Sequence, residues 1–323
     1  MCCAQYCYIM ELNAKGYHRE MNEDASPIVS SLSWPLEMAG RPPRAHAILT
    51  QPGSNIVLDL HGDPCSADLV VFSDGNHHMA LADCLHRFAQ REALPAGIFY
   101  ATAPPGLLAE ALERGCLRSG NLMLRLRPHL FIGPEVVLAR LAERGHVARH
   151  RLFMRSRGVA LLVRKGNPKG ITGLGDILRK DVRLALSNPE SEAASFGLYR
   201  GVILRQLAGC PWPQEQLAAF LESDAVVKSQ VIHHREIPEL LAADCADVSL
   251  VYHHHLALRY VRIFPEHFDL VALADDGGPE AAATYHAGIV GDGGAHGNAL
   301  MEFLCAAEAQ AIYAHHGLRP PEG

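Results

Sequence analysis

The chain has 323 residues, which is too many for one small core and about right for two lobes of roughly 100–150 residues each. Hydrophobic residues make up 49% of the sequence and charged residues 20%, the composition of a soluble globular protein. The formal net charge of −6 argues against a nucleic-acid-binding protein, which would usually carry a concentrated basic face. No apolar stretch approaches the roughly 20 residues needed to span a bilayer.

Cysteine usage and the start of the chain bear on the compartment. The nine cysteines are odd in number and scattered, with no Cys-x-x-Cys pair, so we expect reduced thiols and no structural zinc. The first residues lack the basic and then apolar layout of a secretory signal, and Cys2 and Cys3 follow no apolar run that would indicate a lipid anchor. We therefore expect either a cytoplasmic protein or a start that differs from that of the mature chain.

Residues 1–65 show little periodicity and contain turn formers such as Arg41-Pro-Pro-Arg44. We expect an irregular N-terminal extension there, with one short strand at residues 56–60. From residue 66 the pattern changes to strands that alternate with helices. The strands are expected at residues 69–72, 98–100 and 129–132, and the helices after them near residues 79–89, 107–114 and 134–144.

A second set of elements follows a long apolar strand. The expected elements are strands at 158–163, 182–186, 248–252, 268–273 and 285–290, helices at 174–180, 236–243, 298–305 and 308–315, and more than one helix between about 194 and 221. Such alternation predicts an α/β fold of two lobes, each a mostly parallel sheet flanked by helices. We assign residues 66–155 with 280–323 to the first lobe and residues 156–279 to the second. Ligands bind such sheets beyond the carboxyl ends of the strands, which places the ligand cleft between the lobes.

Several short motifs occur in a family-like order between about residues 67 and 320. They are Val163-Arg-Lys-Gly-Asn-Pro168 with Ile171-Thr-Gly-Leu174, Leu184-Ala-Leu-Ser-Asn-Pro-Glu190, Ala246-Asp-Val-Ser-Leu-Val-Tyr252, and Ala307-Glu-Ala-Gln-Ala-Ile312 with Gly317. Together they resemble the type 2 periplasmic solute-binding proteins, in particular the molybdate/tungstate-binding group of ABC transporters. The resemblance implies a periplasmic-binding-protein-like fold with a bound oxyanion, a monomer without enzymatic activity, and an ABC permease as partner. It also implies a periplasmic location, although no signal peptide is visible.

The resemblance also implies ligand-binding positions. The family holds its ion with backbone N–H groups and short polar side chains, and the matching positions here are Asn76, Pro105, Ala194, Ser195, His234 and Tyr252. Three of these depart from the family pattern, and the first is Asn76, where Ser is common in the family. Pro105 has no N–H to donate, and His234 stands where a small apolar residue is usual.

Two residues near this site, Ser73 and Asp74, are interpreted from their chemistry. A tetrahedral dianion needs many aimed donors in a cleft of little net charge, and Ser73 is a further candidate donor. Asp74 would repel an anion if its carboxylate pointed into the cleft. We therefore expect Asp74 to cap the helix that follows it.

Seven histidines on the predicted cleft loops leave an alternative open. They are His77, His78, His233, His234, His253, His254 and His255. Neutral imidazole is a good ligand for a transition metal, so the cleft could bind a metal or a metal complex, although adjacent imidazoles cannot all share one ion. A third hypothesis is a cytosolic ligand sensor or metallocofactor-assembly partner with the same fold.

Enzymatic functions find little support. The sequence has no His-Glu-x-x-His, Gly-x-Ser-x-Gly or phosphate-binding P-loop motif, so we assign no catalytic residue and no required cofactor. The glycine-rich run Gly288-Ile-Val-Gly-Asp-Gly-Gly294 follows a late strand, and we expect a turn there.

Overall fold

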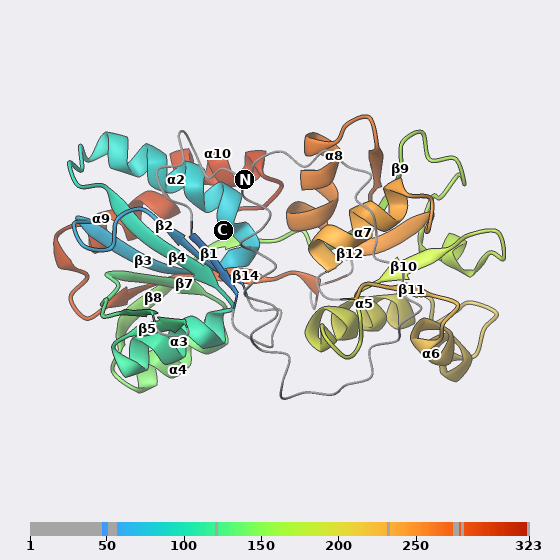
Figure 1. Ribbon diagram of the computed structural model, residues 1–323, viewed down its shortest axis with the longest axis horizontal. Helices are drawn as coiled ribbons and strands as arrows, with labels where there is room; N and C mark the ends of the chain where they lie inside the picture. Colours follow the sequence, from blue (N-terminus) through green and yellow to red (C-terminus); the bar gives the residue numbers. More distant parts are fainter. Residues whose placement is uncertain are drawn as a thin grey trace, which may run out of the picture.

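The computed structural model describes residues 47–50, 57–119, 122–230, 233–273, 278 and 281–321. Two lobes lie side by side, each built on its own sheet with helices packed against it (Figure 1). The predicted two-lobed α/β architecture is therefore confirmed. We call the lobe with the seven-stranded sheet lobe 1 and the lobe with the five-stranded sheet lobe 2.

The sheet of lobe 1 has the strand order β1-β2-β4-β3-β7-β14-β8. The strands are β1 (Ala47–Thr50), β2 (Val57–His61), β3 (Leu69–Asp74), β4 (Ile98–Ala103), β7 (Leu130–Gly133), β8 (Val147–Arg155) and β14 (Thr284–Val290). Strand β3 pairs in parallel with β4 and β7, whereas the other pairs in this sheet are antiparallel. The sheet is therefore mixed, with two parallel and four antiparallel pairs, instead of mostly parallel as the sequence predicts. A separate hairpin pairs β5 (Leu117–Ser119) with β6 (Leu122–Leu124).

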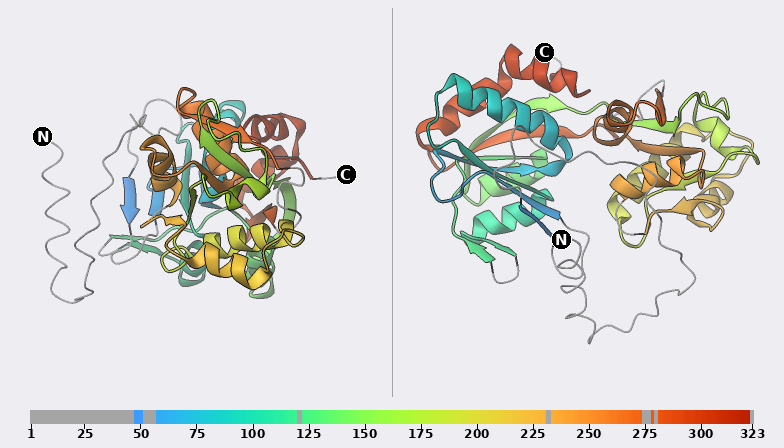
Figure 2. Two further views of the ribbon diagram at one scale, coloured as in Figure 1. Left: turned by 90° about the vertical axis from the view of Figure 1, so that its right-hand side faces the viewer. Right: turned by 45° about the horizontal axis from the view of Figure 1, so that its top comes forward.

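Helices cover both faces of this sheet. On one face lie α2 (His78–Arg91), α9 (Gly294–Cys305) and α10 (Ala307–His315), and on the other α3 (Pro105–Arg114) and α4 (Glu135–Glu143) (Figure 2). Each face has its own apolar core. Leu81, Phe88 and Tyr313 belong to the first core, whereas Leu108 and Leu138 belong to the second.

The sheet of lobe 2 has the order β11-β10-β12-β9-β13 and is also mixed. Its strands are β9 (Val159–Arg164), β10 (Leu184–Leu186), β11 (Val227–Lys228), β12 (Val248–Tyr252) and β13 (Phe268–Val271). Its helices are α5 (Ala193–Gln206), α6 (Gln214–Glu222), α7 (His233–Ala242) and α8 (Arg259–Ile263), together with a π-helical segment, η3 (His253–Leu258), directly before α8.

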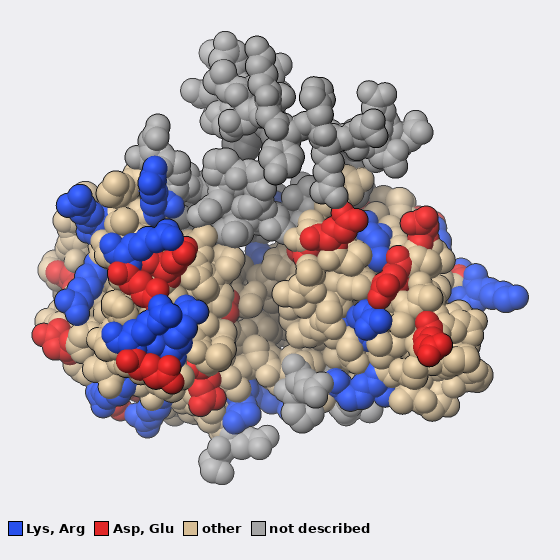
Figure 3. Space-filling view, turned by 90° about the horizontal axis from the view of Figure 1, so that it is seen from below, with Lys and Arg blue, Asp and Glu red and all other residues tan. Residues whose placement is uncertain are grey.

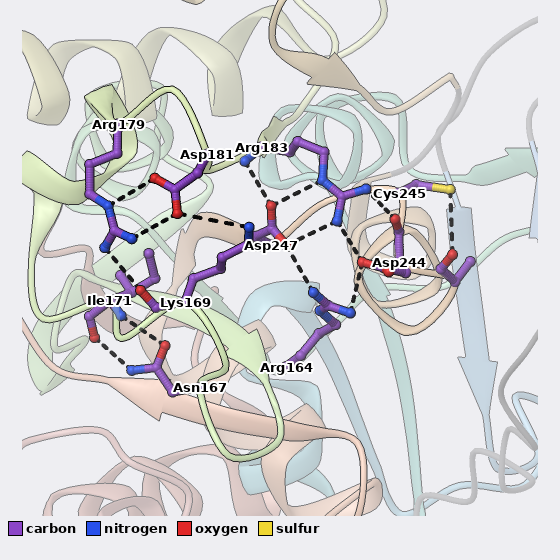
Figure 4. A network of polar contacts seen from close by, with 11 residues as sticks. Arg164, Asn167, Lys169, Ile171, Arg179, Asp181, Arg183, Asp244, Cys245 and Asp247 are labelled. Atoms are coloured by element: carbon purple, nitrogen blue, oxygen red, sulfur yellow. Dashed lines mark hydrogen bonds and ion pairs between the residues drawn. The ribbon is translucent and has the colours of Figure 1, made fainter.

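An ion-pair network fastens three strands of lobe 2 together (Figure 4). The side chain of Asp247, just before β12, is fully buried and accepts hydrogen bonds from Arg164 at 2.9 Å and from Arg183 at 3.0 Å. Arg164 ends β9 and Arg183 precedes β10, so one carboxylate joins three neighbouring strands. Burial alone would raise the pKa of Asp247, but its hydrogen bonds with Arg183 lower that pKa to about 2.

Ser156 ties together the two chain segments that cross between the lobes. Its backbone N–H donates to the Ala283 carbonyl at 2.8 Å, and its Oγ accepts from the Ala283 N–H at 2.8 Å. The same Oγ also accepts from the Gly158 N–H at 3.2 Å. Because Ser156 follows β8 and Ala283 precedes β14, this buried serine joins the outward and the returning connection. The expected lobe boundary at residues 279–280 lies outside the described residues.

Four local predictions are corrected by the structure. Residues 174–180 form only the 3₁₀ turn η2 (Leu174–Leu178), because Asp176 accepts hydrogen bonds from the Thr172 and Gly173 N–H groups and tightens the turn. Strand β8 was not predicted. The glycine-rich run leads directly into α9, which begins at Gly294 instead of residue 298. The three consecutive histidines, expected in a loop, begin the π-helix η3.

The expected N-terminal extension is described only in part. The strand predicted at residues 56–60 is present as β2, which pairs with β4 and so belongs to the sheet of lobe 1. Strand β1 extends this edge of the sheet. Residues 1–46 lie outside the described part of the chain.

Candidate ligand site between the lobes

The predicted site loops from both lobes meet where the lobes face each other. Asn76, just beyond β3, contacts His254 of η3 across the junction, at an imidazole Nε2 to carbonyl oxygen distance of 3.0 Å. Figure 3 shows a hollow between the two lobes, and the visible part of its walls is largely uncharged. The carboxyl ends of β3 and β12 thus approach one space from opposite sides.

A directed chain of hydrogen bonds organises the loop after β3. Ser73 Oγ donates to the Asp74 carbonyl at 3.0 Å and lies 3.1 Å from His77 Nε2, while His77 Nδ1 lies 2.9 Å from the Tyr313 hydroxyl. Because Ser73 has a single proton to donate, His77 Nε2 donates to Ser73 and Tyr313 donates to His77 Nδ1. Burial lowers the pKa of His77 to about 3, so this ring stays neutral. Ser73, a predicted ligand donor, is completely buried within this chain.

Asp74 caps the 3₁₀ turn η1 (Gly75–His77), as the sequence predicts, because its Oδ1 accepts from the Asn76 N–H at 2.8 Å. The side chain of Asp74 is nevertheless buried, with only 5% of the residue exposed. Burial raises the pKa of Asp74 to about 6, and the hydrogen bond from Asn76 offsets only part of that rise. Both backbone groups of Asn76 are engaged, one with Asp74 and one with His254, which leaves its half-buried side-chain amide for a ligand.

The adjacent strand supplies Pro105 and Thr102. Pro105 is the first residue of α3, and it has no N–H to offer, as expected. Thr102 lies beside Ser73 in the parallel register of β3 and β4. It is 2% exposed, and its Oγ1 has no hydrogen-bond partner within the described residues. We did not select Thr102 from the sequence, although its place near the end of a strand is the signal that could have found it.

Lobe 2 contributes Ser195 and Tyr252. Ser195 Oγ, in the first turn of α5, lies 3.4 Å from the hydroxyl of Tyr252 at the end of β12. No side chain of the described residues caps α5, so its first N–H groups, including that of the exposed Ala194, remain for solvent or a ligand. Burial raises the pKa of the Tyr252 hydroxyl, and the charge of Asp74 contributes to the rise from the opposite lobe. The two halves of the predicted site are therefore close enough to interact.

A second chain of hydrogen bonds supports Tyr252 from behind. The Tyr252 N–H donates to the Tyr199 hydroxyl at 3.3 Å, and that hydroxyl lies 3.0 Å from His233 Nε2. His233 Nδ1 lies 2.6 Å from Glu192 Oε1, while Glu192 Oε2 accepts from the His233 N–H at 2.7 Å and from Ser229 Oγ at 3.0 Å. Neither Glu192 nor Tyr199 was selected from the sequence, because these partners are far apart along the chain.

The remaining histidines gather beside this chain. His234 Nδ1 lies 3.1 Å from His255 Nε2, and the ring centroids of His78 and His255 are 5.7 Å apart. Burial, followed by neighbouring histidines, lowers the pKa of His234 and of His255 well below its usual range. Within the described ranges, no three His, Cys, Asp or Glu side chains are placed to hold a metal ion. His253 packs elsewhere, against Gly317, so the seven predicted histidines do not form one centre.

Comparison with solved structures identifies this architecture as that of periplasmic binding proteins. The periplasmic molybdate-binding protein of Azotobacter vinelandii is 16% identical, with a TM-score of 0.53 over 79% of this chain and 100% of that chain. The tungstate-binding protein TupA of Desulfovibrio alaskensis is 10% identical, with a TM-score of 0.54 over 79% and 99%. The sulfate-binding protein SubI of Mycobacterium tuberculosis is 16% identical, with a TM-score of 0.55 over 79% and 87%.

The sequence itself places the chain in a family. Residues 69–319 match the family of bacterial extracellular solute-binding proteins, and the chain belongs to this family. No curated protein sequence matches it. The described helices include none with the length and apolar character needed to cross a membrane.

Proposed function

We propose that this protein captures a small oxyanion of the molybdate or tungstate type between its lobes and delivers it to the permease of an ABC importer. The observation that carries the proposal is the pair formed by the Ser195 and Tyr252 hydroxyls, 3.4 Å apart at the uncapped N-terminus of α5. Hydroxyl and helix N–H donors bind an anion without fixed positive charge, and their rigid support favours one ligand geometry.

Three further features support an oxyanion ligand. The Asn76 amide and the Thr102 hydroxyl offer donors from lobe 1, opposite the pair in lobe 2. The Glu192 and Tyr199 chain holds Tyr252 and the start of α5 in fixed relative positions. Solved relatives of this fold include proteins named for binding molybdate, tungstate and sulfate.

Titration calorimetry of the full chain with molybdate, tungstate and sulfate tests the proposal. We expect heat of binding with at least one of them and about tenfold weaker binding in Ser195→Ala and Tyr252→Phe, since each variant removes a hydrogen bond to a charged group. Ser66→Ala is the matched control, because Ser66 donates to Asp63 at 2.7 Å in an exposed turn. Absence of heat with all three ions would refute the proposal.

A further inference from the structure

Asp74 is an unusual residue for an anion site. Only 5% of the residue is exposed, and one N–H, that of Asn76, donates to its carboxylate. In the described part of the chain no Lys, Arg or His forms an ion pair with it. A buried carboxylate without a cation is costly in its charged form and would repel a dianion brought close to it.

The described groups around Asp74 supply no positive charge. His77 lies three residues after it in η1, and the charge of Asp74 acts on the hydroxyls of Tyr285 in β14 and Tyr252 in β12 of lobe 2. Burial, followed by the charge of Asp74, raises the pKa of the Tyr285 hydroxyl, and the same carboxylate contributes to the raised pKa of Tyr252. His254 reaches the same junction from η3, 3.3 Å from the Tyr285 hydroxyl. Glu192 of lobe 2 adds a second negative charge on the Tyr252 side.

We propose that capture of a doubly charged oxyanion takes up one proton at Asp74, so that the carboxyl group donates a hydrogen bond to the ligand. The proton comes from solvent and binds the carboxylate oxygen that does not cap η1, while the ligand keeps its charge and all its bonds. Asp74 is then a specificity-determining residue of the site, and affinity depends on pH. This inference rests on the proposed function, because it concerns the same site and the same ligands.

The direction and size of the pH dependence follow from burial. Asp74 titrates at about 6, because burial raises its pKa from the usual 3.8. Burial lowers the pKa of His77 to about 3 and that of His254 to about 4, so these two rings are already neutral above pH 6. The receptive, protonated form of Asp74 is about half the population near pH 6 and about one hundredth near pH 8, so the dissociation constant rises about 50-fold between them.

The experiment is calorimetric titration of the full chain with molybdate, tungstate and sulfate near pH 6 and near pH 8. These ions stay doubly charged over that range, so a change in affinity reports on the protein. Each titration is repeated in two buffers of different ionisation enthalpy, which measures the protons taken up per ligand. We expect about one proton near pH 8 and about half a proton near pH 6 in the wild type.

The variant Asp74→Asn isolates the contribution of Asp74 to the pH dependence of affinity. An asparagine can still cap η1 through its Oδ1 and offers a permanent donor in place of the carboxyl group. We expect it to bind more tightly than the wild type near pH 8 and to show less than about a threefold change in affinity between the two pH values.

The experiment distinguishes failure of the proposed function from failure of the role proposed for Asp74. If the wild type binds none of the three ions at either pH, the proposed function fails and this inference fails with it. If the wild type binds but takes up no proton, the proposed function stands and the role of Asp74 is overturned. The proton count needs no variant, so it decides the question even if Asp74→Asn does not fold.

Discussion

His254 of lobe 2 donates a hydrogen bond to the backbone carbonyl of Asn76 in lobe 1, with 3.0 Å between Nε2 and the oxygen. A carbonyl can only accept, so Nε2 carries the hydrogen and Nδ1 is unprotonated in the neutral ring. That Nδ1 is buried and has no hydrogen-bond partner within the described residues. A second proton on Nδ1 would be buried without an acceptor, so burial favours the neutral ring at this contact between the lobes.

The preference for a neutral His254 predicts that the free energy of unfolding falls in acid. Burial lowers the pKa of His254 from 6.5 to about 4, so the fold favours the neutral ring while the unfolded chain accepts a proton at higher pH. The stabilisation is complete above about pH 6.5 and is lost as the pH falls towards 4. In His254→Gln we expect the loss of unfolding free energy over this range to be smaller by about 1–3 kcal/mol. Urea unfolding at a series of pH values measures it.

The control for this variant is His86→Gln on the exposed surface of α2. It should leave the pH dependence of unfolding as in the wild type. Equal pH profiles for His254→Gln and the wild type would contradict the assignment of a neutral, interlobe His254.

In the ligand-free protein, the contribution of Asp74 to the free energy of unfolding is predicted to depend on pH in the opposite sense. Its pKa is raised from 3.8 to about 6, so the fold favours the protonated acid, and stability is present at low pH and lost as the pH rises through 6. We expect Asp74→Asn to raise the unfolding free energy near pH 8 by about 1–3 kcal/mol, with the gain shrinking towards pH 4. The exposed Asp63 caps a turn through the Cys65 N–H, and Asp63→Asn should give no such gain. A destabilised Asp74→Asn near pH 8 would argue against a costly buried carboxylate.

Replacing Asp247 with a neutral residue is predicted to lower the stability of the fold at neutral pH. Hydrogen bonds with Arg183 outweigh the effect of burial and lower its pKa to about 2, so its contribution is present above about pH 3.8 and is lost as the pH falls through 2. We expect Asp247→Asn to lower the unfolding free energy at pH 7 by about 1–3 kcal/mol, measured by chemical denaturation. Asp269→Asn, which disrupts the more exposed pair with Lys165, should cost less than about 1 kcal/mol. Equal losses in both variants would contradict the central role of Asp247.

A side chain at position 317 is predicted to clash at the contact between the lobes. The φ of Gly317 is +83°, and a Cβ there would lie 2.4 Å from Leu258 Cδ2 on η3 of lobe 2. Gly145 has a φ of +75° and open space around it, so Gly145→Ala measures the backbone strain alone, about 1 kcal/mol. We expect Gly317→Ala to lower the unfolding free energy by about 1 kcal/mol more than that control. Equal thermal and chemical stability of the two variants would show that Leu258 moves aside without cost.

The order of strands and helices could be predicted because most strands are short apolar runs bounded by turns. Strand β8 was missed because Arg149, Arg151 and the half-buried His150 interrupt its apolar residues, as suits a strand at the edge of a sheet. The π-helix η3 was missed because a run of three histidines has no helical periodicity. Its residues become buried only through partners in other elements, such as Asn76 and His234.

Only part of the arrangement at the candidate site could be predicted from the sequence. Ser195 and Tyr252 lie together as the resemblance implies, because each ends or begins an element that the sequence makes recognisable. The supporting Glu192 and His233 are 41 positions apart, and no local pattern connects them. Whether Ser73 and His234 contact a ligand stays a prediction, since Ser73 is fully buried and His234 is engaged with His255.

The serine that fastens both crossings has a consequence for how the molecule moves. Ser156 bonds the outgoing segment to the returning one through two hydrogen bonds with Ala283. These hydrogen bonds couple the two connections, so we expect the two segments to bend together. We therefore expect the lobes to separate mainly by a hinge rotation at this pair of segments.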